Sequence, residues 1–234
     1  MKTIGLIGGM SWESSQTYYR LINQGVRDAL GGLHSARLVM YSVDFAEIET
    51  LQHQGDWEAT ATILAKAARA LEAAGADFMV LCTNTMHKVA EQIEQAVSIP
   101  LLHIADATAS VLKSAGVTSV GLLGTRFTME QAFYRDRLEQ QGIRVLIPEE
   151  SQRERVHRVI YDELCLGQIR DDSRKAYLDI VASLAERGAQ GVILGCTEIG
   201  LLIQAADTEV ALYDTTRIHA EQAVRVALTD KPAD

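Results

Sequence analysis

Two of the three cysteines in the chain share a local sequence that suits acid–base chemistry. Cys82 and Cys196 each follow a short apolar run, and each is followed directly by a threonine. A thiolate can accept a proton and a thiol can donate one, so two cysteines can act as base and acid in one reaction. Proton transfer at both faces of one carbon requires such a pair, because a single side chain would have to move between the faces. We therefore predict that Cys82 and Cys196 are the catalytic residues.

The residues after Cys82 suit the binding of an anion. Thr83, Asn84 and Thr85 are typical of helix starts and offer hydroxyl and backbone N–H donors. Such donors fit an amino-acid carboxylate and the negative charge that develops when its α-proton leaves. The helix expected to follow them should also lower the pKa of the Cys82 thiol.

The remaining cysteine and the histidines suggest no other chemistry. Cys165 lies in a helical pattern, and we interpret it as a packing residue. Three cysteines without a Cys-x-x-Cys motif do not fit a disulfide scaffold or a redox pair. No histidines stand at metal-ligand spacing, so no metal site is predicted. His87 is expected either to tune Cys82 or to hydrogen-bond the loop that follows it.

Both Cys-Thr pairs belong to a longer internal repeat. The run at Ile4–Gly8 recurs at Val120–Gly124, and the run at 75–83 recurs at 188–197 with one added residue. A weaker match pairs 101–108 with 211–216. Three matches in the same order predict a duplicated structural unit.

Short apolar runs alternate with longer amphipathic ones along the chain, a pattern typical of parallel sheets covered by helices on both faces. The fold class is therefore α/β, with two pseudo-symmetric lobes that each contain a parallel sheet flanked by helices. Strands are predicted at Thr3–Ile7, Arg37–Ser42, Phe78–Leu81, Leu101–Ile104, Ser119–Leu123, Arg144–Ile147, Gly191–Leu194 and Val210–Tyr213. Helices are predicted at about 14–30, 56–74, 86–97, 105–115, 127–141, 151–167, 173–187 and 216–228.

Each Cys-Thr pair ends one of these strands. Ligands of open parallel sheets bind beyond the carboxyl ends of the strands. Two units related by a pseudo-twofold axis would place both pairs on the walls of one shared space, so we expect an active-site cleft between the lobes.

Composition excludes several function classes. The net charge is −9, whereas a general nucleic-acid or anionic-membrane partner would require a basic patch. No apolar run approaches the roughly 20 residues of a membrane span, and the N-terminal run is too short for a signal peptide. The glycines near the N-terminus do not form a dinucleotide-binding motif. We expect a cytoplasmic protein that binds a small molecule, with no nucleic-acid or membrane partner.

The motifs together resemble the aspartate/glutamate racemase family. They are Gly8-Gly9-Met10, the 82–85 segment with His87, the 121–125 segment and the 195–198 segment, and they span nearly the whole chain. The resemblance implies an amino-acid racemase that needs no pyridoxal phosphate, no metal and no other cofactor, and that is frequently a homodimer. It implies substrate-binding roles for Met10, Gln52, Thr83, Asn84, Thr85, Thr125, Thr197 and Glu198.

The resemblance also implies an exchange of strands between the lobes. The 100–104 region would join the second sheet and the 210–214 region would return to the first. The N-terminal lobe is accordingly expected at 1–98 plus about 208–234, and the C-terminal lobe at about 99–207.

One departure from the family bears on the substrate. Aspartate-specific relatives carry an Arg in the loop after the second strand and a Lys near position 165. Here neither the loop at 44–52 nor the helix at 161–165 contains a cation, although Arg is the natural partner of a carboxylate. The substrate is therefore aspartate, glutamate or a broader range that includes neutral amino acids. Alternatives are a related carbon-acid isomerase that uses cysteine, a hydantoin racemase, or a non-catalytic amino-acid binding module.

Overall fold

The computed structural model describes residues 1–229 and divides the chain into two compact units. Unit 1 contains Met1–His103 and the segment that begins at His219, and unit 2 is the continuous stretch Ile104–Ile218. The last five residues of the expected N-terminal lobe, 230–234, lie outside the described residues.

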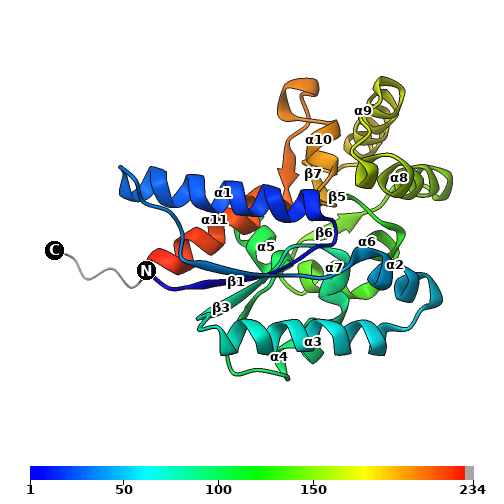
Figure 1. Cartoon of the computed structure of the whole chain (residues 1–234). Coiled ribbons are helices and arrows are strands. Elements are labelled where there is room, and N and C mark those ends of the chain that lie inside the picture. Colours follow the sequence, from blue (N-terminus) through cyan, green and yellow to red (C-terminus); the bar gives the residue numbers. More distant parts are fainter. Residues whose placement is uncertain (230–234) are drawn as a thin grey trace. The chain divides into compact units, whose positions relative to one another are not determined.

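Unit 1 contains a parallel four-stranded sheet in the order β2-β1-β3-β4 (Figure 1). Ile4 of the central strand β1 is in register with Leu38 of β2 and Phe78 of β3. The strands are β1 (Ile4–Gly8), β2 (Leu38–Ser42), β3 (Phe78–Leu81) and β4 (Leu101–Leu102). The helices are α1 (Trp12–Leu30), α2 (Phe45–Gln54), α3 (Trp57–Ala73), the 3-10 helix η1 (Thr85–Val89), α4 (Ala90–Glu94) and α11 (Thr215–Leu228), whose first residues belong to unit 2.

Helices cover both faces of this sheet, and strand alternation decides which side chain faces which helices. Phe78 and Val80 share one core cluster with residues of α1 and α11, and Cys82 continues that face. Met79 and Leu81 lie in a second cluster with residues of α3 and α4. Successive side chains of a strand point to opposite faces, so the side chain of Cys82 points toward the layer of α1 and α11. Figure 1 shows these two helices on one side of the sheet and α3 and α4 on the other.

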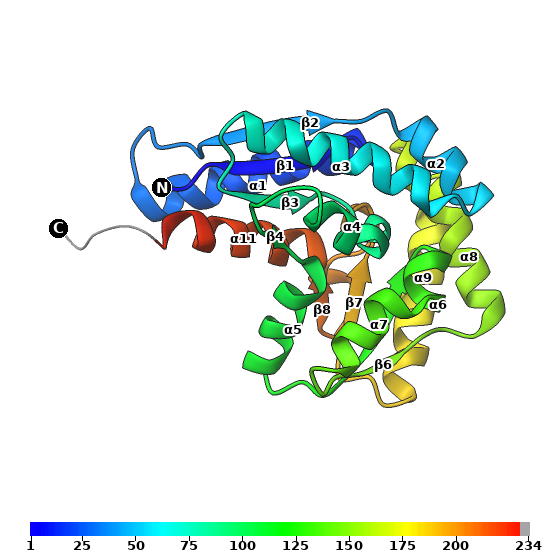
Figure 2. The ribbon, with the colours of Figure 1, turned by 90° about the horizontal axis from the view of Figure 1, so that it is seen from below.

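Unit 2 repeats the plan with the sheet order β6-β5-β7-β8 (Figure 2). Its strands, all parallel, are β5 (Ser119–Gly124), β6 (Arg144–Leu146), β7 (Val192–Gly195) and β8 (Leu212–Asp214). Its helices are α5 (Ile104–Ser114), α6 (Arg126–Glu130), α7 (Ala132–Glu139), α8 (Glu150–Asp162), η2 (Leu164–Leu166), α9 (Asp171–Glu186), α10 (Ile199–Leu202) and η3 (Ala205–Asp207). The identical strand order in the two units confirms the predicted α/β fold class with a duplicated sheet.

The expected exchange of strands between the lobes is wrong. Leu101 of β4 pairs with Met79 of β3, so β4 closes the sheet of unit 1. Leu212 of β8 pairs with Val192 of β7, so β8 closes the sheet of unit 2. Each short edge strand thus completes the sheet of the preceding Cys-bearing strand, and the chain changes units after β4 and after β8.

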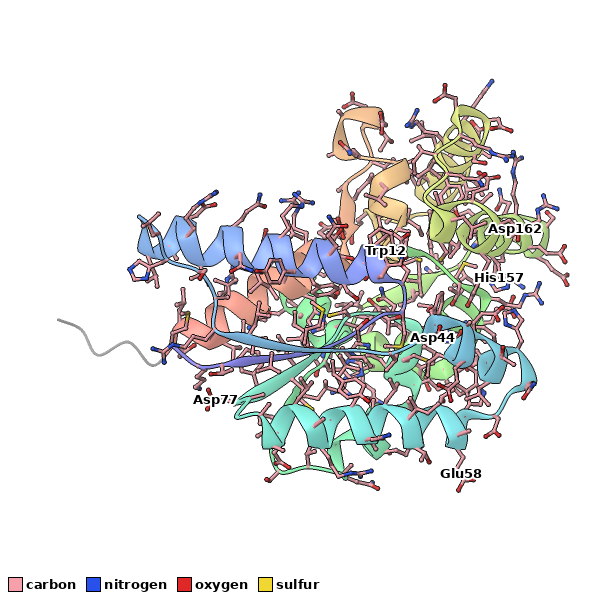
Figure 3. The ribbon with its side chains drawn as sticks, in the orientation of Figure 1. Trp12, Asp44, Glu58, Asp77, His157 and Asp162 are labelled. Carbon is pink, nitrogen blue, oxygen red and sulfur yellow. The ribbon has the colours of Figure 1, made fainter. Side chains whose placement is uncertain are left out.

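The segment after β2, expected as a loop, forms the helix α2. Asp44 caps it: its side chain accepts a hydrogen bond from the Ala46 N–H, and Figure 3 shows Asp44 at the start of the helix. Gly55, in the left-handed conformation, ends it. Only Ile48 and Gln52 of α2 are buried, so the apolar stripe that would predict a helix is short.

Candidate active site

Cys82 follows β3 and is held at both of its backbone polar groups. Its N–H donates to the carbonyl of Ile7 at 2.9 Å, which extends the pairing of β3 with β1. Its carbonyl accepts a hydrogen bond of 2.9 Å from the hydroxyl of Ser14, in the first turn of α1. The cysteine itself is completely buried.

The same turn of α1 holds the loop that follows β1. The hydroxyl of Ser15 accepts a hydrogen bond from the Gly9 N–H at 2.7 Å and donates to the carbonyl of Ser11 at 3.0 Å. Gly9 has a φ of 95°, a conformation that favours glycine. The next residue, Met10, is buried in the core cluster that also contains Met86.

Gln52, expected to contact substrate, lies at the buried side of α2. Its side-chain amide lies 2.9 Å from the sulfur of Met86. Met10, Gln52 and Met86 thus occupy one part of unit 1 and connect the β1 loop, α2 and η1. The substrate-binding roles of Met10 and Gln52 stay predictions.

The three polar residues after Cys82 are all buried and lead into η1. His87 donates a hydrogen bond from Nδ1 to the carbonyl of Thr83 at 2.8 Å, since a carbonyl can only accept. This is the loop-bonding role that was one of the two expectations for His87.

Behind His87 lies a cluster of buried aromatic and histidine rings. The ring centres of His87 and His103 are 4.5 Å apart, and those of His87 and His219 are 5.9 Å apart. His219 donates from Nε2 to the carbonyl of Leu102 at 2.8 Å, so its Nδ1 accepts from the hydroxyl of Tyr18, also at 2.8 Å. Burial lowers the pKa of His219 to about 4.

This depressed pKa predicts a loss of stability in acid. In the unfolded chain a histidine has a pKa of about 6.5, so between pH 6.5 and 4 the unfolded state binds the additional proton. The contribution of neutral His219 is therefore complete above pH 6.5 and is lost as the pH falls toward 4. We expect the free energy of unfolding to drop by about 2–3 kcal/mol more in the wild type than in His219→Gln between pH 7 and 4.5.

Urea denaturation at the two pH values measures this difference. His34→Gln is the matched control, because His34 is exposed. Equal acid sensitivity of the wild type and His219→Gln would contradict the prediction.

In unit 2, Cys196 follows β7 in the position that Cys82 has after β3, and it is 8% exposed. Its thiol lies 3.0 Å from Oε2 of Glu198, and the hydroxyl of Thr197 donates to the same oxygen at 2.7 Å. Glu198 is only 3% exposed. The sequence predicted Glu198 as a substrate-binding residue, but the contact between its carboxylate and the thiol was not predicted.

Thr125 follows β5, the central strand of unit 2, and caps α6. Its hydroxyl accepts a hydrogen bond from the Thr128 N–H at 3.3 Å. A side chain at Gly124 would place its Cβ 2.8 Å from the carbonyl oxygen of Gly195, so β5 and β7 can approach closely there. Thr125 and Cys196, which follow these two glycines, are thereby presented at the carboxyl ends of adjacent strands.

Both candidate catalytic thiols have a raised pKa. For Cys82 the cause is burial. For Cys196 burial is again the largest cause, and the nearby Glu198 carboxylate adds to it. The expectation that a helix start lowers the pKa of Cys82 is wrong, because the residue is fully buried and only a 3-10 turn follows it.

The structure therefore groups the predicted residues into two sets, one in each unit. Unit 1 holds Cys82, Thr83, Asn84, Thr85, Met10 and Gln52, and unit 2 holds Cys196, Thr197, Glu198 and Thr125. Sequence reasoning missed Ser14 and Ser15, whose only signal was a pair of hydroxyl residues at a helix start beside a glycine loop.

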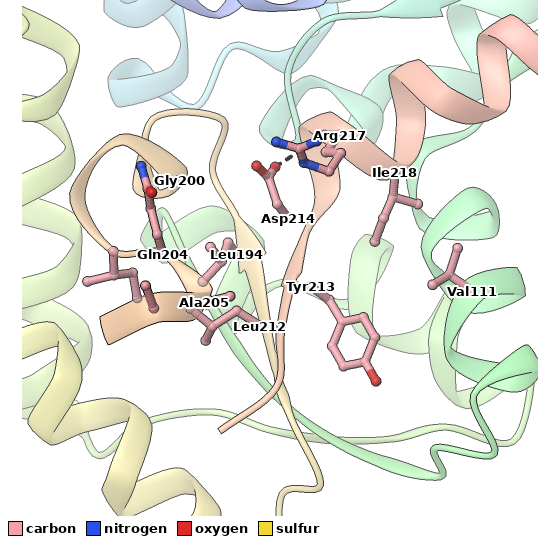
Figure 4. A pocket seen from close by; sticks show the side chains of 12 residues that line it. Val111, Leu194, Gly200, Gln204, Ala205, Leu212, Tyr213, Asp214, Arg217 and Ile218 are labelled. Carbon is pink, nitrogen blue, oxygen red and sulfur yellow. Dashed lines mark hydrogen bonds between the residues drawn. The ribbon is translucent and has the colours of Figure 1, made fainter. Parts of the chain in front are cut away.

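A pocket of about 580 Å³ lies beside β8 in unit 2, and its lining includes Leu194 and Gly200, which flank the 196–198 segment in the sequence (Figure 4). One oxygen of Asp214 accepts from the N–H groups of Thr216 and Arg217 at 2.9 and 3.2 Å, and so caps the start of α11. Burial raises the pKa of Asp214. The lining does not include Cys196, Thr197 or Glu198, and the carboxylate has a structural role.

Within residues 1–229, no cluster of three or more His, Cys, Asp or Glu side chains could hold a metal ion. Over the same residues, no helix combines the length and apolar character that crossing a membrane requires.

Comparison with known proteins decides the family. A family model described as Asp/Glu/hydantoin racemase matches residues 7–223. The chain belongs to the Asp/Glu/hydantoin racemase family. This match includes both Cys-Thr segments and confirms the resemblance that the motifs suggested. Family membership supports an enzyme of the racemase type.

Solved and curated relatives within this racemase family match over most of the chain. A Yersinia pestis protein, provisionally described as an Asp/Glu racemase, is 58% identical, with a TM-score of 0.91 over 97% of this chain and 100% of that chain. PH1733 of Pyrococcus horikoshii, an aspartate racemase homologue, is 35% identical, with a TM-score of 0.84 over 97% of this chain and 99% of that chain. The broad specificity amino-acid racemase RacX of Bacillus subtilis is 27% identical over 162 residues, which are 68% of each chain.

Proposed function

We propose that this chain is a cofactor-independent amino-acid racemase in which Cys82 and Cys196 act as a thiolate/thiol pair. The observation that carries the proposal is the repeated placement of a buried cysteine after the third strand of each unit, followed each time by a threonine. Membership of the racemase family supports it. A structural role alone would not account for the same Cys-Thr pair at the same place in both copies.

The reaction requires two proton transfers at one carbon. One cysteine, as thiolate, takes the α-hydrogen as a proton: the C–H bond breaks, an S–H bond forms, and the electron pair passes into the substrate carboxylate as an enediolate. The other cysteine, as thiol, then gives its proton to the opposite face of the carbon and becomes the thiolate. The two thiols titrate as a pair, because the ionisation state of one is linked to that of the other through the reaction.

The weak acidity of the α-hydrogen is the main barrier, so the negative charge on the carboxylate must be stabilised. We assign this task to the Thr83–Thr85 segment of unit 1 and to Thr125 and Thr197 of unit 2. All are buried residues next to the carboxyl ends of strands, the positions at which parallel sheets bind ligands. Met10 and Gln52 contribute uncharged side chains to the proposed substrate site.

The substrate range follows from the charges available for its side chain. The helix α2 contains no Lys or Arg, and neither does the 161–166 stretch at the end of α8. A second carboxylate would lack the bidentate partner that it prefers. We therefore propose a broad range that includes neutral amino acids, with aspartate and glutamate as possible members, in keeping with the description of the relative RacX.

All three cysteines are free thiols. The proposed base must stay reduced, which suits the cytoplasm. We propose a homodimer there, acting on a free amino acid.

The function is tested by incubating each L-amino acid, and homoserine, with the protein in deuterium oxide and separating the enantiomers. We expect the D enantiomer to form with one solvent deuterium at Cα, in the absence of added pyridoxal phosphate or metal. Antipode that retains protium at Cα would contradict proton exchange through two thiols.

The same assay separates the alternatives. Racemisation of a 5-substituted hydantoin without any turnover of amino acids would indicate a hydantoin racemase. A mass increase on Cys82 during turnover would indicate an isomerase that bonds covalently to its substrate. Thermal stabilisation by an amino acid without any change in its enantiomeric composition would indicate a binding module.

A further inference from the structure

The two candidate catalytic cysteines differ in their immediate polar contacts. The Cys196 thiol lies 3.0 Å from Oε2 of Glu198. Among residues 1–229, the polar contact of the Cys82 sulfur is a long one, 3.9 Å, with the carbonyl of Val80. The duplicated units therefore place a carboxylate against one thiol and a neutral backbone oxygen near the other.

The carboxylate accepts and the thiol donates in this contact. Oε2 of Glu198 also receives the hydroxyl proton of Thr197 at 2.7 Å, and a carboxylate oxygen has lone pairs for both donors. Glu198 is 3% exposed, so water screens its charge poorly. Ionisation of Cys196 would remove the donated proton and place a second negative charge 3.0 Å from the first.

We propose that Glu198 is a positioning residue that keeps Cys196 protonated, so that Cys196 is the proton donor of the resting enzyme and Cys82, which contacts no carboxylate within residues 1–229, is the base. This inference rests on the proposed racemase function. It reassigns Glu198, because a buried carboxylate bound to a thiol and a hydroxyl would repel a substrate carboxylate.

Protons balance in each half of the cycle. When Cys82 takes the α-proton and Cys196 gives one up, the enzyme is left with the Cys196 thiolate beside the Glu198 carboxylate. That form returns to the resting state when a proton moves from Cys82 to Cys196, by exchange with solvent or by turnover of the opposite enantiomer.

Comparing the rates of the two directions of racemisation at one pH cannot reveal this asymmetry. Two enantiomers with a single stereocentre have the same free energy in water, so kcat/KM must be equal in the two directions. The ionisation of each thiol must therefore be observed directly.

Iodoacetamide labelling as a function of pH provides that observation, because the thiolate is the reactive form. Trypsin releases the three cysteines in separate peptides, 70–88, 159–170 and 188–217, so mass spectrometry follows each thiol individually. Burial slows labelling by a factor that does not depend on ionisation, so the pH midpoint still reports the thiol's own pKa.

Glu198→Gln keeps an oxygen acceptor and removes the charge. We expect the labelling midpoint of Cys196 to fall by at least about one pH unit, a tenfold faster reaction at pH values below the midpoint. The midpoint of Cys82 should not change, and it is the reference because Cys165 and Tyr177 interact electrostatically with Cys196. Glu163→Gln is the matched control: this partly buried carboxylate of unit 2 accepts from the Ser173 hydroxyl and should leave the Cys196 midpoint unchanged. An unchanged Cys196 midpoint in Glu198→Gln, a shift of all three thiols together, or an equal shift in Glu163→Gln would overturn the proposal.

The pH profile of racemisation gives a second readout. The active pair needs one thiolate and one thiol, so ionisation of Cys196 ends activity at high pH. Glu198→Gln should move this alkaline limb of kcat/KM to lower pH, whereas a uniform loss at every pH would overturn the proposal. Labelling needs no substrate. It therefore tests the effect of Glu198 on Cys196 separately from the chiral assay, which tests the racemase function.

Discussion

Replacing Cys82 or Cys196 with alanine is expected to lower kcat/KM for racemisation by ~10³-fold or more, while the protein stays folded. Each thiol performs one of the two proton transfers, so its replacement removes one of the two steps. A loss of this size corresponds to about 4 kcal/mol of transition-state stabilisation. Polarimetry or chiral chromatography measures the rate, and circular dichroism measures the folding. Cys165→Ala is the control and should keep a rate close to that of the wild type.

Isotope exchange refines this prediction. A variant with one remaining cysteine can still remove and return a proton on one face of the carbon. We expect Cys82→Ala and Cys196→Ala to exchange the α-hydrogen of opposite enantiomers with solvent deuterium, each without inversion. Exchange of the same enantiomer by both variants, or a single variant that racemises at the full rate, would refute the two-thiol mechanism.

Gly9→Ala is expected to destabilise the protein by about 3 kcal/mol or more. The φ of 95° at Gly9 is unfavourable for any residue with a Cβ. An added Cβ would also collide with the carbonyl oxygen of Val43, which is backbone and cannot rotate away. Urea denaturation measures the loss of stability, and failure of the variant to fold would be its extreme form.

Gly55→Ala is the matched control for this prediction. Gly55 also has a positive φ, 74°, but a Cβ there would meet no atom within 4 Å. Gly55→Ala should lower the free energy of unfolding by only about 1–2 kcal/mol. If both variants lost the same stability, the collision with Val43 would not contribute, and the tight loop before Met10 would need another explanation.

The sheets were predictable because their central strands β1, β3, β5 and β7 are buried on both faces. Phe78–Leu81 was predicted with the bounds that the structure shows, and the other strands were within a few residues. The pairing of the edge strands was harder to predict. The strand β4 has only two residues, too few to indicate which sheet it joins. The helix α2 was missed because only two of its ten residues are buried.

The candidate site was predictable as far as residue types repeat in the sequence. The repeated Cys-Thr pairs identified Cys82 and Cys196, and strand ends located their neighbours. The direction of the Glu198 side chain and the reach of Ser14 to the Cys82 carbonyl depend on side-chain rotamers and helix packing, which a local sequence pattern does not encode. The pKa of Cys82 was predicted in the wrong direction because its complete burial could not be read from the sequence.

The division of unit 1 into two stretches of chain has a consequence during synthesis. Its core includes Ala220 and Ala223 of α11, the last helix, whereas unit 2 is one uninterrupted stretch. During synthesis, the first hundred residues therefore cannot complete their core until 104–218 and the start of α11 have been made. We expect a chain that ends at residue 218 to protect the half that carries Cys196 from protease better than the half that carries Cys82.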